Sequence, residues 1–86
     1  MSIKERFGTN LRRARRKAGL TQEEVALLVE MDRGKISNFE TGKGTPRLDT
    51  LLKLMGALDC RADELVEGLA WRPDPMAYGR WEVGDA

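Results

Sequence analysis

The sequence contains no histidine and only one cysteine, Cys60. Without histidine, the chain has no histidine-based catalytic triad, no imidazole general base and no histidine-containing zinc ligand set. One cysteine forms no internal disulfide, and we expect Cys60 to be a small buried residue rather than a redox sensor. A glycine-rich phosphate-binding loop is also missing. These absences argue against an enzyme, and they give no sign of a metal, a cofactor or a small-molecule ligand.

Long hydrophobic runs are missing too. Although 41% of the 86 residues are apolar, no run approaches the roughly 18 consecutive apolar residues that would span a membrane. The opening segment, residues 1–6, lacks the apolar stretch of a secretory signal. Together with the single cysteine, this composition favours a cytoplasmic protein with no membrane partner.

Charge is distributed unevenly along the chain, although its net value is only +1. Residues 1–50 hold 11 basic and 7 acidic side chains, whereas residues 51–86 hold 4 and 7. Basic groups on one face can bind phosphate even when the whole molecule is nearly neutral. Because solvated basic faces are common, this gradient agrees with nucleic-acid binding but does not establish it.

Apolar residues at helical spacing predict an all-α fold. The first helix spans about residues 3–18 and ends at Gly19, because glycine accepts the left-handed conformation that closes a helix. A second helix, at about 22–29, begins with a capping box formed by Thr21 and Glu24. Its expected buried residues are Val25, Ala26, Leu28 and Val29.

Three further helices follow in the pattern. Asp32 is the expected N-cap of a third helix at about 33–41, which carries Ile36 and Phe39 inward. The expected buried residues of the fourth helix are Leu48, Leu51, Leu52, Met55 and Leu58. Those of a short fifth helix are Ala62, Leu65, Val66 and Leu69.

The helical pattern ends at Pro73, and no strand pattern precedes it. Residues 76–83 could form a short extended segment, although Gly79 weakens that interpretation. We therefore predict a compact five-helix domain over residues 1–70 and a C-terminal tail over residues 71–86.

Only three residues, 30–32, separate the second and third predicted helices. A joint this short is typical of a helix-turn-helix, whose second helix can lie in the major groove of DNA. Arg33 can pair with guanine and Asn38 with adenine, each through two hydrogen bonds. With Ile36 and Phe39 facing the core, the side left facing out comprises Arg33, Gly34, Lys35, Ser37, Asn38 and Thr41. Each residue alone fits a solvated surface equally well, and it is the joint arrangement that favours DNA binding.

This order of motifs resembles the lambda-repressor-like, Cro/C1-type helix-turn-helix family, also called the xenobiotic-response-element family. The resemblance extends over about residues 5–69, and the stretches that carry it are residues 11–26, 36–42, 46–54 and 62–65. It implies a five-helix DNA-binding domain with double-stranded DNA as the partner.

The resemblance also implies roles for individual residues. Taken together, the resemblance and the outward positions of the third helix give these candidates for base contact: Gln22, Arg33, Gly34, Lys35, Ser37 and Asn38. The candidates for phosphate contact near the motif are Thr21, Thr41, Lys43, Gly44 and Thr45, since free N–H groups at a helix N-terminus attract phosphate. The chain departs from the family pattern at Glu30, which replaces a turn glycine and must tolerate positive φ. At Gly34 a side chain that often reads a base is missing.

Arg15 and Glu40 match an Arg–Glu pair that ties the first helix to the third in related repressors. Their spacing agrees, because Arg15 lies one turn after Leu11 and Glu40 one turn after Ile36, at the edges of the apolar stripes. We expect this ion pair to be structural rather than a direct DNA contact. Leaving one partly buried partner unpaired would cost on the order of 3 kcal/mol.

Other basic residues surround the outside of the first helix. Arg12 and Arg16 are candidates for contact with the DNA backbone, and a solvated helix surface explains them equally well. Adjacent residues lie about 100° apart around a helix. Arg12, Arg13, Arg16 and Lys17 therefore cannot all face the same duplex.

One recognition helix reads only a few base pairs, so regulators of this kind usually bind palindromic half-sites as dimers. We therefore predict a homodimer. Its expected interface is the fifth helix with the tail, through Leu69, Trp71, Tyr78 and Trp81. Aromatic residues favour interfaces but also fill cores, so the same residues could instead cover the core of their own chain.

The sequence thus predicts a DNA-binding transcription regulator, most simply a homodimeric repressor on a palindromic operator. A phage or mobile-element repressor, a restriction–modification controller and an autoregulating antitoxin all fit this description. The alternative is a protein-interaction adaptor that uses the helical domain as a scaffold and the aromatic tail as its binding surface.

Overall fold

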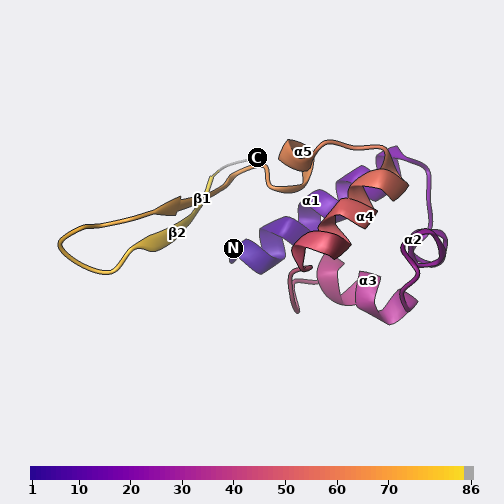
Figure 1. Ribbon diagram of the computed structural model, residues 1–86, viewed down its shortest axis with the longest axis horizontal. Helices are drawn as coiled ribbons and strands as arrows, with labels where there is room; N and C mark the ends of the chain where they lie inside the picture. The colour runs from indigo at the N-terminus through magenta and orange to yellow at the C-terminus, as the bar shows by residue number, and fades with distance from the viewer. Residues whose placement is uncertain (85–86) are drawn as a thin grey trace.

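The computed structural model describes residues 1–84, which form five helices followed by two short strands (Figure 1). The helices are α1 (Ile3–Lys17), α2 (Gln22–Val29), α3 (Arg33–Glu40), α4 (Leu48–Leu58) and α5 (Ala62–Leu65). The strands are β1 (Leu69–Arg72) and β2 (Arg80–Val83). Residues 85–86 of the predicted tail lie outside the described part. None of the helices formed by residues 1–84 is long and apolar enough to cross a membrane.

Local hydrogen bonds fix the starts of α1 and α2. Ser2 and Glu5 form a capping box at α1, and Thr21 and Glu24 form the predicted one at α2, with both backbone donors bonded at 2.9–3.1 Å. These bonds satisfy N–H groups that a helix start leaves unpaired. The prediction for Asp32 was wrong in part: it occupies the N-cap position of α3, but its side chain accepts no capping bond.

The turn of the helix-turn-helix contains a residue in the left-handed conformation. Glu30 closes α2 with φ 59° and ψ 45°, so a non-glycine residue does take the strained position expected there. Gly19, with φ 73°, follows the end of α1 as predicted. The connections on both sides of α2 are therefore short and fixed, and they set the angle at which α3 leaves.

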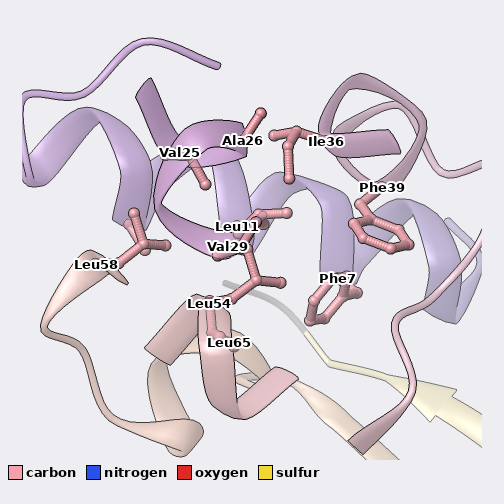
Figure 2. Close-up of a cluster of buried hydrophobic side chains, with 11 residues drawn as sticks. Phe7, Leu11, Val25, Ala26, Val29, Ile36, Phe39, Leu54, Leu58 and Leu65 are labelled. Carbon is pink, nitrogen blue, oxygen red and sulfur yellow. The ribbon is translucent and has the colours of Figure 1, made fainter. Parts of the chain in front are cut away.

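One apolar cluster lies between α1 and the other helices. Leu11, Val25, Val29, Ile36, Leu54 and Leu65 are fully buried in it, and Phe7 and Phe39 close one side (Figure 2). Side chains from all five helices meet here. Burial of these residues is the main favourable contribution to folding of so short a chain.

The buried side of α4 differs from the prediction. Leu54, which the apolar stripe did not include, is fully buried, whereas Leu48 is 72% and Leu52 56% exposed. Leu28 of α2 was also expected inside and is 59% exposed. The apolar stripes on these helices are wider than the surface that a domain of this size can cover, so one edge of each stays outside.

The predictions that the fifth helix includes Leu69 and that no strand precedes Pro73 were wrong as well. The fifth helix ends at Leu65, and Leu69 begins β1, so a strand does precede Pro73. Gly68, with φ 80°, makes the change of direction between them. Strands β1 and β2 pair antiparallel, and the expected boundary between residues 70 and 71 falls inside β1. Cross-strand pairing is a long-range contact, and a four-residue strand leaves little periodic trace in the sequence.

A matched pair of leucines tests this core. We expect Leu54→Ala to lower the free energy of unfolding by about 3 kcal/mol, because it opens a cavity at a fully buried site. Leu28→Ala, at an exposed helix position, should change it by less than about 0.5 kcal/mol. Urea denaturation of both variants measures the difference. Equal costs for the two would contradict the packing described here.

Candidate nucleic-acid interface

Helix α3 turns one side into the core and the other into solvent. Ile36 and Phe39 are buried, and the side chains of Arg33, Lys35 and Asn38 are exposed. None of the side-chain hydrogen bonds found among residues 1–84 uses those three polar groups. Their donors are thus free for an external acceptor, on one face of a short, anchored helix.

The remaining candidates on α3 differ in accessibility. Gly34 is exposed, with open space where a side chain would begin. Ser37 is half-buried, at the edge of the outward face. Thr41 is exposed, but its hydroxyl already donates to the Ser37 carbonyl oxygen at 2.9 Å. It therefore has lone pairs rather than a proton to offer, which makes it a poor donor to phosphate.

The carboxylate of Glu40 anchors the other end of α3. Arg15 forms the expected ion pair with it, with Nε 2.6 Å from Oε2 and Nη2 3.0 Å from Oε1. Arg12 Nε also donates to Oε1 at 3.3 Å, and so does Gln22 Nε2 at 3.1 Å. Arg15 Nη1 donates in addition to the Leu20 carbonyl oxygen at 2.8 Å. One buried carboxylate thus connects α1, α2 and α3.

The protonation of Glu40 follows from these contacts. Burial disfavours its charged form, but the hydrogen bonds from Arg15, Gln22 and Arg12 outweigh burial and lower the pKa of Glu40. The hydrogen bond to Glu40 and the attraction of its charge raise the pKa of Arg15. Both directions describe one ion pair that stays charged in the folded protein.

Gly8 lets α1 and α3 approach closely enough for this network. A Cβ at Gly8 would lie 2.5 Å from the carbonyl oxygens of Phe39 and Glu40. A larger residue there would push the C-terminal end of α3 away from α1. The sequence interpretation did not single out Gly8 or the Gln22–Glu40 bond, since both depend on how the helices cross.

The other phosphate candidates lie at the ends of α2 and α3. Thr21 is exposed at the N-cap of α2, and its hydroxyl oxygen accepts from the Glu24 N–H. Lys43 and Thr45 are exposed in the loop after α3, with half-buried Gly44 between them. The Lys43 N–H donates to the Asn38 carbonyl oxygen at 2.9 Å, which fixes the start of this loop on α3.

The basic residues of α1 point in two directions. Arg12 lies beside Glu40, and Arg16 is exposed. Arg13 and Lys17 instead pair with Glu67 and Glu64 near α5, at 3.0 and 3.4 Å. The four side chains therefore do not all point to one side of α1, and Arg12 and Arg16 stay the candidates for phosphate contact.

The tail residues form a hairpin rather than a cover for the core. Trp71 and Trp81 face each other across β1 and β2, with ring centroids 5.1 Å apart, and each is at least half exposed. Tyr78 is 98% exposed near the tip, and only Leu69 packs against the core.

Cys60 is half-buried next to the core, and burial raises the pKa of its thiol.

Comparisons with known proteins agree with this geometry. A model of a family described as helix-turn-helix matches residues 11–65. The transcriptional regulator ImmR of Bacillus subtilis is 39% identical over 60 residues, which cover 70% of this chain and 47% of ImmR. This chain thus spans about half the length of that relative.

Solved structures show the same architecture. The restriction–modification controller protein C.AhdI from Aeromonas hydrophila has a TM-score of 0.67 at 39% identity, covering 71% of this chain and 92% of that one. The P22 c2 repressor, solved in complex with a synthetic operator, has a TM-score of 0.66 at 31% identity, covering 72% and 94%. The fold is therefore that of a lambda-repressor-like DNA-binding domain. The chain belongs to the helix-turn-helix family of DNA-binding transcriptional regulators.

The lowered pKa of Glu40 predicts a pH dependence of stability. Because the folded state holds this proton less tightly than the unfolded chain, the contribution of Glu40 is complete above its ordinary pKa of 4.5. It is lost as the pH falls through the lower folded value. At pH 7 we expect Glu40→Gln to destabilise the fold by about 3 kcal/mol, because Arg15 loses its charged partner.

The difference in free energy of unfolding between the wild type and Glu40→Gln should shrink as the pH falls from 6 to about 3. Urea denaturation at each pH measures it. Glu23→Gln, which removes an exposed glutamate of α2, is the control and should follow the wild type throughout. A gap between wild type and Glu40→Gln that stays constant over this range would contradict the role assigned to Glu40.

Proposed function

We propose that the chain is a homodimeric repressor that binds a palindromic operator through α3. The observation that carries this proposal is the exposed polar side of α3, held on the body by the buried Ile36, Phe39 and Glu40. Arg33 and Lys35 lie in the first turn of α3, the part of a recognition helix that reaches deepest into the major groove. Such a protein would work in the cytoplasm.

The proposed division of labour follows from side-chain chemistry. Arg33 and Asn38 are proposed to read bases, because each presents two hydrogen-bonding groups at a spacing that matches one base edge. Gln22, Lys35 and Ser37 are proposed as further base contacts. Phosphate contacts are proposed for Thr21, Arg12, Arg16, Lys43, Gly44 and Thr45, which would supply affinity without distinguishing sequences. Thr41 is left out because its hydroxyl already donates to Ser37.

Two of the similar solved structures support this assignment. The P22 c2 repressor was solved on operator DNA, and its fold covers 72% of this chain. C.AhdI is a restriction–modification controller, so that role and the phage-repressor role both have a structural counterpart. Nothing in these relatives supports the alternative of an interaction adaptor.

Selection of bound sequences from random duplex DNA tests the proposal as a whole. We expect a palindromic consensus whose half-sites lie about one helical turn, ~34 Å, apart. Recovery of no consensus, at a salt concentration where the protein still binds duplex DNA, would refute sequence-specific regulation.

Substitutions on α3 test the base contacts. Arg33→Ala and Asn38→Ala should each weaken binding to the selected site by roughly 5- to 150-fold and relax the preference at one base pair of each half-site. Arg61→Ala removes another exposed arginine, at the start of α5, and serves as the control, with affinity unchanged. Fluorescence anisotropy on a matched panel of duplexes measures both effects. Unchanged affinity for both α3 variants would overturn the assignment.

A phosphate contact should behave differently. Lys43→Ala is expected to weaken binding to all duplexes to a similar extent and to reduce the slope of log affinity against log salt by about one unit. The salt titration is repeated on the selected site and on an unrelated duplex. A loss confined to the selected site would mean that Lys43 reads sequence instead.

A further inference from the structure

The hairpin has one apolar and one polar face. Residues paired directly across β1 and β2 point to the same side, so Leu69, Val83, Trp71 and Trp81 share one face. On the other face Arg72 and Glu82 form an ion pair. The apolar face is only partly covered, since Trp71 is 50% and Trp81 57% exposed. The matched family model ends at residue 65, so this hairpin is an addition to the shared domain.

That apolar face forms one wall of a groove. A cavity of about 380 Å³ lies between the hairpin, the N-terminal part of α1 and α4, and opens to solvent. Besides the two tryptophans, its lining includes Ile3, Phe7, Pro46 and Leu51. Next to Leu51 on α4 stand the two exposed leucines, Leu48 and Leu52. A groove and an apolar ridge thus lie side by side on one surface.

We propose that a second copy of this chain occupies the groove, with the ridge of Leu48 and Leu52 inserted between the partner's hairpin and the partner's α4. The inference rests on the homodimer of the proposed function and specifies its interface. In a twofold dimer the same patch of both subunits meets itself, so a surface that carries both a ridge and a groove can be complementary to its own copy. Each hairpin then lies across α4 of the other protomer.

The exposed area is sufficient for such a contact. With about 150–250 Å² for each fully buried aromatic side chain, the exposed halves of Trp71 and Trp81 amount to roughly 250 Å². The two leucines of α4 and the partly exposed lining of the groove raise this to on the order of 500 Å² per protomer, so a twofold contact covers about 1,000 Å², the lower limit for a specific interface. Apolar patches of this size on a monomer typically mark an interaction surface.

The arrangement leaves α3 free. In Figure 1 the hairpin extends away from the helical body along the long axis of the molecule, whereas α3 lies on another side of the body. A copy docked against the hairpin would therefore approach the body from a side other than that of α3. The proposed dimer thus needs both recognition helices to stay accessible to one duplex.

Charge inserted into the ridge tests the interface. The double variant Leu48→Glu/Leu52→Glu should raise the dimer dissociation constant by about 100-fold or more, because four carboxylates would enter an apolar contact. Leu27→Glu, which alters an 80% exposed leucine on α2, should leave the dissociation constant unchanged. Analytical ultracentrifugation measures it, with circular dichroism to confirm that each variant is folded. A double variant that stays dimeric would overturn the proposed interface and leave the homodimer itself intact.

A second measurement does not depend on disrupting the dimer. Leu52→Cys and Trp81→Cys are placed in separate chains that both carry Cys60→Ser, and the two chains are mixed and oxidised. A disulfide between the two different chains supports insertion of the ridge into the partner's groove, and its absence in a dimeric sample would overturn it.

The two proposals can fail separately. A wild-type chain that is monomeric at millimolar concentration would overturn both this interface and the homodimer. Selection of a single half-site by that monomer would still support a sequence-specific regulator. Conversely, a dimer with the expected cross-link but without any selected DNA sequence would support the interface and refute the proposed function.

Discussion

The buried carboxylate of Glu40 is the contact on which the position of the recognition helix depends. It receives hydrogen bonds from Arg12 and Arg15 of α1 and from Gln22 of α2, while it belongs to the last residue of α3. Hydrogen bonds to a buried charge are strong and directional, so they fix angles between helices that apolar contacts alone would leave looser. The close approach of α1 and α3 at Gly8 is the steric counterpart of this network.

The same network links fold stability to the proposed DNA surface. Arg12 and Gln22 are both proposed to face DNA, and both are held by the Glu40 carboxylate. Their side chains are therefore partly ordered before DNA arrives, which reduces the entropy that binding would cost. A short α3 of eight residues can be rigid because its buried side packs in the core and its end is held by charge.

A second constraint is the small size of the domain. The helical body covers Leu54 and Leu58 of α4 but leaves Leu48 and Leu52 outside. The hairpin likewise leaves its tryptophans half exposed. A short chain has too little interior to bury every apolar residue it carries. The proposed dimer would cover these two leucines and the two tryptophans.

Local patterns in the sequence were enough to predict the helices, the short joint between α2 and α3, the outward side of α3 and the Arg15–Glu40 pair. Capping boxes and helical periodicity involve residues within one or two turns, so they can be read without coordinates. The buried side of α4, the Gln22–Glu40 bond and the pairing of β1 with β2 required the tertiary structure. Each depends on residues far apart in the chain, because an apolar stripe does not specify which edge its neighbours will cover and a four-residue strand carries no sign of its partner.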